Sequence, residues 1–161
     1  MNVREQILNL LSQIPDPEIP VISIVELGVI RDVKNEGAAV EVIITPTYSG
    51  CPAMKQMEDD VVKKLRANGF EAVKVTMSYS PAWTTDWLSA EAKEKLQRYG
   101  IAPPEEKTTD KSFITGMHKQ ITCPRCKSRN TKMISQFGST ACKALYQCED
   151  CLEPFDYFKC I

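Results

Sequence analysis

Two C-x-x-C pairs in the last quarter of the sequence constrain the fold more than any other feature. CPRC supplies Cys123 and Cys126, and CEDC supplies Cys148 and Cys151. Each pair turns two sulfur atoms toward one point, and two pairs complete a tetrahedron with Zn–S distances of about 2.3 Å. We therefore predict a structural zinc ion here. A bound iron or iron–sulfur cluster is the alternative, because four thiolates suit both.

The segments around these pairs resemble three short strands: TKMISQFG, TACKALYQ and PFDYFKC. A domain of about 40 residues cannot bury enough hydrophobic core to be stable by itself, so we expect a bound metal to stabilise it. We expect a small β-rich zinc-ribbon domain at residues 119–161. Cys142 and Cys160 are left over. They are either small buried side chains, or one of them is a replacement ligand or a transfer thiol.

Residues 1–101 have the pattern of a small mixed domain. Apolar residues at helical spacing predict a helix over 3–14, which the prolines of PDPEIP (residues 15–20, the DPE loop) end. Residues 21–34 are expected to be extended. Alternating apolar residues predict strands at 40–44 and 73–79, and helical periodicity predicts helices after Pro52 and near 89–99. The predicted fold class is α+β: a two-layer α-β-β-α-β-α domain followed by the ribbon.

The stretch between the two parts has the composition of a linker. YGIAPPEEKTTDKSFITGMHK contains Pro103-Pro104, a charge cluster and few apolar residues, so we place a linker at residues 102–118. The formal net charge of −1 gives no reason to expect nucleic acid as a partner. No apolar run approaches the roughly 20 residues of a membrane span, and the start does not resemble a signal peptide. We therefore expect a cytoplasmic protein with reduced cysteines.

Cys51 stands apart from the other cysteines, in TPTYSGCP, where a strand pattern gives way to a helix pattern. Pro52 suits the first helical position, which places Cys51 at or next to the N-cap. The helix dipole and free backbone N–H groups there favour a thiolate, so Cys51 is a candidate for metal binding or chemistry. A buried cap residue without chemistry fits the geometry equally well.

The motifs of common enzyme classes do not occur in the sequence: a phosphate-binding loop, a dinucleotide fingerprint or H-E-x-x-H. The lone histidine, His118, lies in the predicted linker, which is a poor place for the base of a cysteine nucleophile. Paired Glu-x-x-His motifs of a di-iron site are also missing. We expect no catalytic activity of the chain itself. A thiol-dependent enzyme using Cys51 is the weakest of the hypotheses.

PDPEIP followed by ELGVI, and then a strand leading into T-x-x-x-CP, resembles the iron–sulfur-assembly family that includes the SufT-like proteins. The same domain followed by a four-cysteine tail ending in EPFDYFKC resembles the PaaD family of phenylacetate degradation, whose members are counted as part of the multicomponent phenylacetyl-CoA epoxidase. By position, the resemblance implies a pocket formed by Asp16, Glu18, Thr47 and Cys51. The loop reads TPTYSGCP here, with Tyr48-Ser49 in place of the smaller residues of the wider family.

The implied role is accessory to the epoxidase in aerobic phenylacetate catabolism. The epoxidase needs a di-iron oxygenase and a reductase with flavin and an iron–sulfur centre. The chain would mature or repair a metal centre of one of these partners, with iron or a cluster held transiently at Cys51. The alternative is a non-catalytic structural adaptor that bridges oxygenase and reductase. The resemblance leaves the oligomeric state open, a homodimer included.

Overall fold

The computed structural model describes residues 1–105 and 120–159, and it divides the chain into two compact units, Met1–Trp83 and Thr84–Ile161. Each unit is described by itself below. Among the helices of the described residues, none is long and apolar enough to cross a membrane. The predicted linker 102–118 lies largely outside the described residues, as do His118 and Cys160. The division into 1–101, 102–118 and 119–161 therefore stays a prediction.

The first unit contains two helices and three strands: α1 (Val3–Leu11), β1 (Ile30–Glu36), β2 (Ala39–Ile44), α2 (Ala53–Arg66) and β3 (Ala72–Met77). Local signals set the helix starts and ends. Asn2 and Glu5 form a reciprocal capping box at the start of α1. The helix α2 ends just before Gly69, whose φ of 91° suits glycine.

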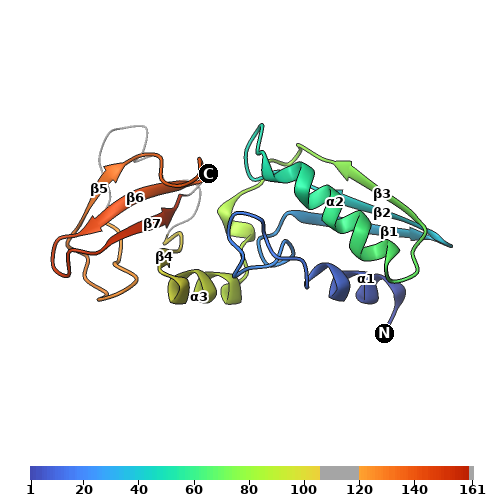
Figure 1. Cartoon of the computed structure of the whole chain (residues 1–161), viewed down its shortest axis with the longest axis horizontal. Coiled ribbons are helices and arrows are strands. Elements are labelled where there is room, and N and C mark those ends of the chain that lie inside the picture. The colour runs from blue at the N-terminus through green and yellow to red at the C-terminus, as the bar shows by residue number, and fades with distance from the viewer. Residues whose placement is uncertain (106–119, 160–161) are drawn as a thin grey trace. The chain divides into compact units, whose positions relative to one another are not determined.

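The sheet of the first unit has the order β1-β2-β3, with β1 antiparallel and β3 parallel to β2. The parallel pair requires a crossover, and α2 supplies it. Figure 1 shows α2 lying across this sheet, and α2 contacts β3 and α1. Its buried residues include Met57, Val61 and Leu65. The connection between the end of β2 and the start of α2 (residues 45–52, the cysteine loop) is thus held at both ends by a regular element.

The prediction that residues 21–34 are extended is wrong for its first half. Residues 21–28 form turns, and β1 begins only at Ile30. Ser23 and Glu26 bond reciprocally, side chain to backbone, at 2.8 and 3.2 Å. Gly28, with a φ of 82°, then reverses the chain. Local side-chain hydrogen bonds outweigh the strand pattern here, because they satisfy backbone groups that a strand would leave to a partner.

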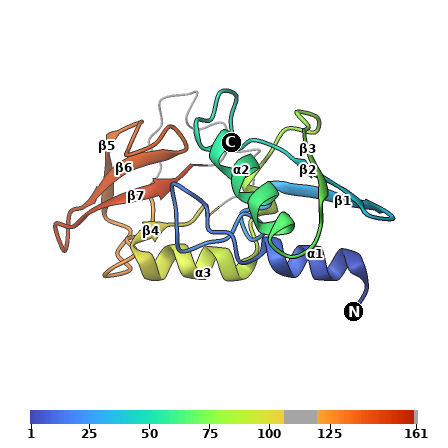
Figure 2. The same cartoon turned by 45° about the vertical axis from the view of Figure 1, so that its right-hand side comes forward.

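The described residues of the second unit form a 3₁₀ turn, one helix and four strands: η1 (Thr85–Trp87), α3 (Ala90–Tyr99), β4 (Ile101–Ala102), β5 (Thr131–Ser135), β6 (Lys143–Cys148) and β7 (Pro154–Phe158). The last three strands lie side by side in Figures 1 and 2, as predicted. Ser89 caps α3 and Gly100 ends it, both as predicted. Tyr146 packs against Phe155 and Tyr157 with ring centroids 5.9 and 5.6 Å apart, which forms the core.

The short strand β4 was not predicted. Ile101 and Ala102 pair in parallel with Asp156 and Tyr157 of β7, so the sheet order is β4-β7-β6-β5. The predicted boundaries place these two residues at the end of the first domain and the start of the linker. The helix α3, which was predicted to close the first domain, is likewise grouped with the second unit. The α+β fold class is confirmed, with a β-rich C-terminal part.

Candidate functional site

The four predicted ligand cysteines form one cluster. The sulfur atoms of Cys123, Cys126, Cys148 and Cys151 all lie within 4.8 Å of one another. The Cys123–Cys151 and Cys126–Cys148 sulfur distances are 3.8 and 3.5 Å. A tetrahedron with metal–sulfur bonds of about 2.3 Å has edges of about 3.8 Å, whereas a disulfide would need about 2.05 Å. A multi-iron cluster would spread the sulfurs further, so the spacing fits a single metal ion.

Two matching backbone turns hold these sulfurs. The N–H of Cys123 donates to Ser128 O at 2.8 Å, and the N–H of Cys148 donates to Glu153 O at 3.0 Å. The residue after the second cysteine of each pair, Lys127 or Leu152, has a left-handed φ of 66° or 63°. Such a conformation is uncommon for residues other than glycine, and its repetition shows that each turn is shaped to aim both of its sulfurs inward.

Ionisation of all four cysteines of the cluster would require a cation. A hydrogen bond from the backbone N–H of Cys151 is the main cause that lowers the pKa of Cys148 to about 7, against burial. Cys151 accepts a hydrogen bond from the backbone of Glu153, yet burial and the three neighbouring sulfurs raise its pKa to about 12. Thiolates this close repel one another, so all four can ionise together only around a positive ion. The donor set therefore fits a thiophilic metal.

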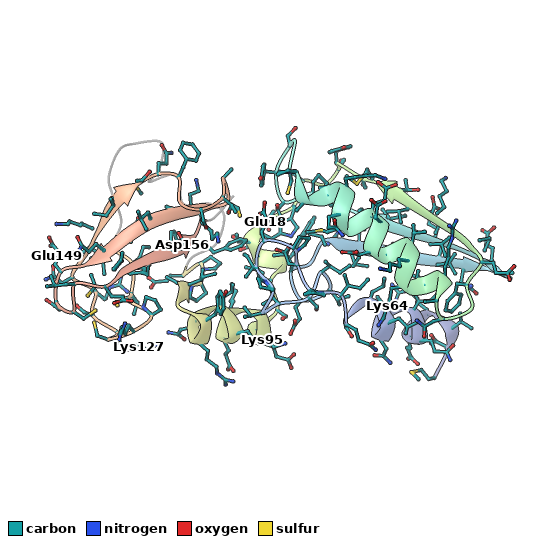
Figure 3. All side chains as sticks on the ribbon, viewed as in Figure 1. Glu18, Lys64, Lys95, Lys127, Glu149 and Asp156 are labelled. Carbon is teal, nitrogen blue, oxygen red and sulfur yellow. The ribbon has the colours of Figure 1, made fainter. Side chains whose placement is uncertain are left out.

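Hydrogen bonds and an ion pair between polar side chains join the two cysteine turns. Asp150 accepts hydrogen bonds from Ser128 Oγ and, at 2.8 Å, from Asn130 Nδ2. The hydrogen bond from Ser128 lowers the pKa of Asp150 most, and the bond from Asn130 lowers it further. Arg125 of the first pair forms an ion pair with Glu153 beyond the second, at 2.9 Å. Figure 3 shows Lys127 and Glu149, which follow cysteines of the two pairs, at one end of this unit, away from Asp156.

In the first unit, Asp16 is buried and Glu18 is half-buried in the DPE loop. Asp16 Oδ1 accepts hydrogen bonds from the backbone N–H groups of Glu18 and Ile19, at 2.9 and 2.7 Å. The prolines on either side provide no N–H, so this carboxylate satisfies the donors that the loop does present. Asp16 therefore shapes the loop that carries Glu18.

Thr47 and Cys51 come together in the cysteine loop. Both are buried, and the Thr47 hydroxyl donates toward Cys51 Sγ at 4.0 Å, the long end of a hydrogen bond to sulfur. The N-cap of α2 is Pro52, with the helix beginning at Ala53, so Cys51 directly precedes the cap. Since Pro52 makes no side-chain cap bond, the positive end of the helix faces the cysteine loop uncapped.

Backbone hydrogen bonds fix the base of the DPE loop and the start of the cysteine loop. Ile24 N donates to Ile14 O at 3.0 Å, which closes the DPE loop at its base. Thr45 N, at the start of the cysteine loop, donates to Val29 O at 2.9 Å. The buried Trp83 donates a hydrogen bond from Nε1 to Leu27 O at 3.0 Å, which holds the turns of residues 21–28. A direct contact between Asp16 or Glu18 and Cys51 stays a prediction.

Sequence reasoning missed two features of these sites. Asp150 lies inside CEDC, where it reads as an ordinary turn residue until its partners Ser128 and Asn130 are known. Thr45 is 1% exposed, and its hydroxyl is one of three buried polar groups in the described residues without a hydrogen-bond partner. The alternation of Thr45 with Thr47 in TPT was the only signal for it.

Two family models match the chain. The model described as "Iron-sulfur cluster assembly protein" matches residues 4–80, and that described as "PaaD zinc beta ribbon domain" matches residues 107–159. These two matches correspond to the two sites, the cysteine loop in the first and the four-cysteine cluster in the second. The class is thus an iron–sulfur-assembly domain joined to a zinc ribbon.

The chain belongs to the PaaD family: it is 50% identical, over 97% of its length and 92% of the relative's, to one subunit of the "Putative 1,2-phenylacetyl-CoA epoxidase" of Escherichia coli (strain K12). It is 34% identical, over 60% of its length, to "Fe-S protein maturation auxiliary factor" of Porphyromonas gingivalis, covering 92% of that protein. The chain is also similar to a crystal structure of a domain of unknown function, DUF59, from Bacillus anthracis. The match covers 58% of this chain and 90% of the Bacillus anthracis chain, with a TM-score of 0.55 and 30% identity. A conserved hypothetical protein of Thermotoga maritima matches 59% of this chain and 94% of its own, with a TM-score of 0.51 and 28% identity.

Proposed function

We propose that the chain is an accessory factor of a phenylacetyl-CoA epoxidase system, which matures or repairs the iron or iron–sulfur centre of a partner subunit. In this role Cys51 holds the iron or cluster as a transient cargo, with Asp16, Glu18 and Thr47 around it. The partners are the oxygenase and reductase subunits. The ribbon carries a structural zinc ion at its four cysteines and docks the partner.

The observation that carries this proposal is the environment of Cys51. Its sulfur is buried beside the Thr47 hydroxyl and directly precedes an uncapped helix start. A cysteine sulfur at such a position can serve as a ligand for iron. A second support is the pairing of relatives: one is named as an epoxidase subunit and another as an iron–sulfur maturation factor.

Zinc is the proposed resident metal of the ribbon because the sulfur spacing fits one tetrahedral ion. The backbone turns and the Asp150 and Arg125 bonds hold the ligands in place. The second turn joins β6 to β7, within the small sheet whose core is built around Tyr146. The zinc would act by holding this sheet together, and it would leave no position open for a substrate.

The proposal is tested by metal and sulfide analysis of anaerobically purified full-length protein, as wild type and as Cys51→Ser. We expect one zinc in both, with iron and sulfide in the wild type alone. Cys142→Ser is a matched control, since Cys142 is a buried cysteine of the described residues that belongs to neither site. Equal iron in wild type and Cys51→Ser would overturn the carrier role of Cys51.

A structural adaptor is the second candidate, favoured by apolar side chains on the surface of the second unit. Ile134, Phe137 and Leu152 are 52%, 62% and 67% exposed. Such side chains are suited to contact with a partner protein. An adaptor would co-purify stoichiometrically with the epoxidase and would support full activity as Cys51→Ser. A carrier would associate transiently, and its Cys51→Ser variant would leave the partner deficient in iron.

A further inference from the structure

Thr45 carries a buried hydroxyl that nothing in the described structure satisfies. The residue is 1% exposed, and its Oγ1 has no hydrogen-bond partner. A buried hydroxyl without a partner loses its hydrogen bonds to water and gains none in return, so such groups are rare in native proteins. Valine would fill the same space without this cost. The Thr45 hydroxyl is therefore available to a hydrogen-bond acceptor that the free protein does not contain.

Thr45 begins the cysteine loop, which also carries Thr47 and Cys51. Thr45 N bonds Val29 O at 2.9 Å and Ser78 N bonds Ile44 O at 2.8 Å, so the chain stays extended just past β2. Pro46 also disfavours a helical conformation at the residue before it. In an extended chain, residues two apart lie on the same side. By this argument we place Thr45 on the same side of the chain as Thr47, whose own hydroxyl is 4.0 Å from Cys51 Sγ.

We propose that Thr45 is a positioning residue of the Cys51 site, whose hydroxyl donates a hydrogen bond to the sulfur atoms of an iron–sulfide cargo held by Cys51. This inference rests on the proposed function and deepens it. Sulfide and thiolate sulfurs are hydrogen-bond acceptors, and donors around them tune the potential of a cluster. A hydroxyl that is unsatisfied in the free protein and satisfied by the cargo favours the loaded state, because its desolvation cost is already present before binding.

Two variants separate this role from a structural one. Thr45→Val keeps the shape and removes the hydroxyl, whereas Thr45→Ser keeps the hydroxyl. Thr85→Val is the matched control: Thr85 is also a 1% exposed threonine with an unpartnered hydroxyl, and it belongs to the second unit. All are made in the full chain with its ribbon metal bound.

The first measurement is urea unfolding without added iron. We expect Thr45→Val and Thr85→Val to unfold at the same urea concentration as the wild type or a higher one. The second is anaerobic loading with ferrous iron and sulfide, followed by desalting. We expect Thr45→Val to retain severalfold less iron and sulfide, and its remaining cargo to have a more negative reduction potential. Thr45→Ser and Thr85→Val should load as the wild type does.

Three results would overturn the inference. If Thr45→Val unfolds at lower urea than the wild type, its hydroxyl has a partner within the fold, such as a buried water. If Thr45→Val matches the wild type in iron, sulfide and potential while Cys51→Ser loses its cargo, the proposed function survives and the role of Thr45 falls. If wild type and Cys51→Ser retain equal iron and sulfide, the proposed function is wrong, and the role of Thr45 that rests on it is wrong too.

Discussion

At the scale of single residues, Asp16 acts on its own loop. Two hydrogen bonds run from backbone N–H groups to its Oδ1, and the residue is 3% exposed. The Asp16 carboxylate shapes the backbone of the DPE loop, which also carries Glu18 of the predicted pocket. A residue can therefore be essential to such a site without touching a ligand.

Replacing Asp16 by alanine should destabilise the first unit by about 1–3 kcal/mol, because two backbone N–H groups lose their acceptor inside the protein. Urea unfolding of the full chain, followed by amide hydrogen exchange in residues 1–83, measures the effect. Asp16→Asn keeps an oxygen at this position and should lose less. An alanine variant as stable as the wild type would show that the two N–H groups find another acceptor.

At the scale of elements, the ribbon is two equivalent turns joined by side chains. The Asp150 carboxylate bridges from the second turn to Ser128 and Asn130 beyond the first. These bonds resist the separation of the two cysteine pairs, which is the motion that would release a metal. Asp150→Ala should speed metal loss to a chelator about tenfold, a typical effect for residues that support ligands.

The rate of metal transfer to an excess of a chromophoric chelator measures this effect. Lys132→Ala is a suitable control, because its ion pair with Glu149 at 3.1 Å is exposed and lies outside the bridge. Equal transfer rates in Asp150→Ala and the wild type would mean that the backbone turns alone hold the pairs together.

The ribbon metal should also be lost on acidification. Its four ligands bind as thiolates, and protons compete for sulfurs such as that of Cys151, whose metal-free pKa is raised to about 12. Lowering the pH adds protons to the metal-free state, so apparent affinity must fall from about pH 8 to about pH 6. Competition with a chelator of known affinity at each pH tests this. An affinity independent of pH would contradict binding by four thiolates.

At the scale of the whole molecule, each unit has its own core. The first is built from β1–β3 with α1 and α2, and the second from the aromatic cluster around Tyr146. Cys123 and Cys148 belong to that second cluster, so the metal site and the core share residues. Removal of the metal should therefore affect the second unit far more than the first.

Treatment of the full chain with a strong chelator should raise amide exchange throughout β5, β6 and β7 and leave β1, β2 and β3 protected. Hydrogen exchange read by mass spectrometry distinguishes the two units in one experiment. Restoration of protection on adding zinc back is the control. Exchange rising equally in both units would show that they unfold together, against the separate domains predicted from the sequence.

Much of the fold could be predicted because its signals are local. Ser89 caps the helix that it precedes, Gly100 ends it, and alternating apolar residues mark β2 and β3. The four ligand cysteines were also evident, since each C-x-x-C pair makes its own turn. The turn at residues 21–28 was missed because the Ser23–Glu26 bonds competed with an apolar pattern that looked like a strand.

The sequence by itself determined the fold class, the four-cysteine cluster and the place of Cys51 before a helix, because each depends on residues a few positions apart. Only the tertiary structure decided that Ile101 and Ala102 pair with β7, that Thr47 faces Cys51 and that Thr45 is buried without a partner. Strand pairing and burial depend on contacts between segments that are distant in the sequence, and short-range sequence patterns do not predict such contacts.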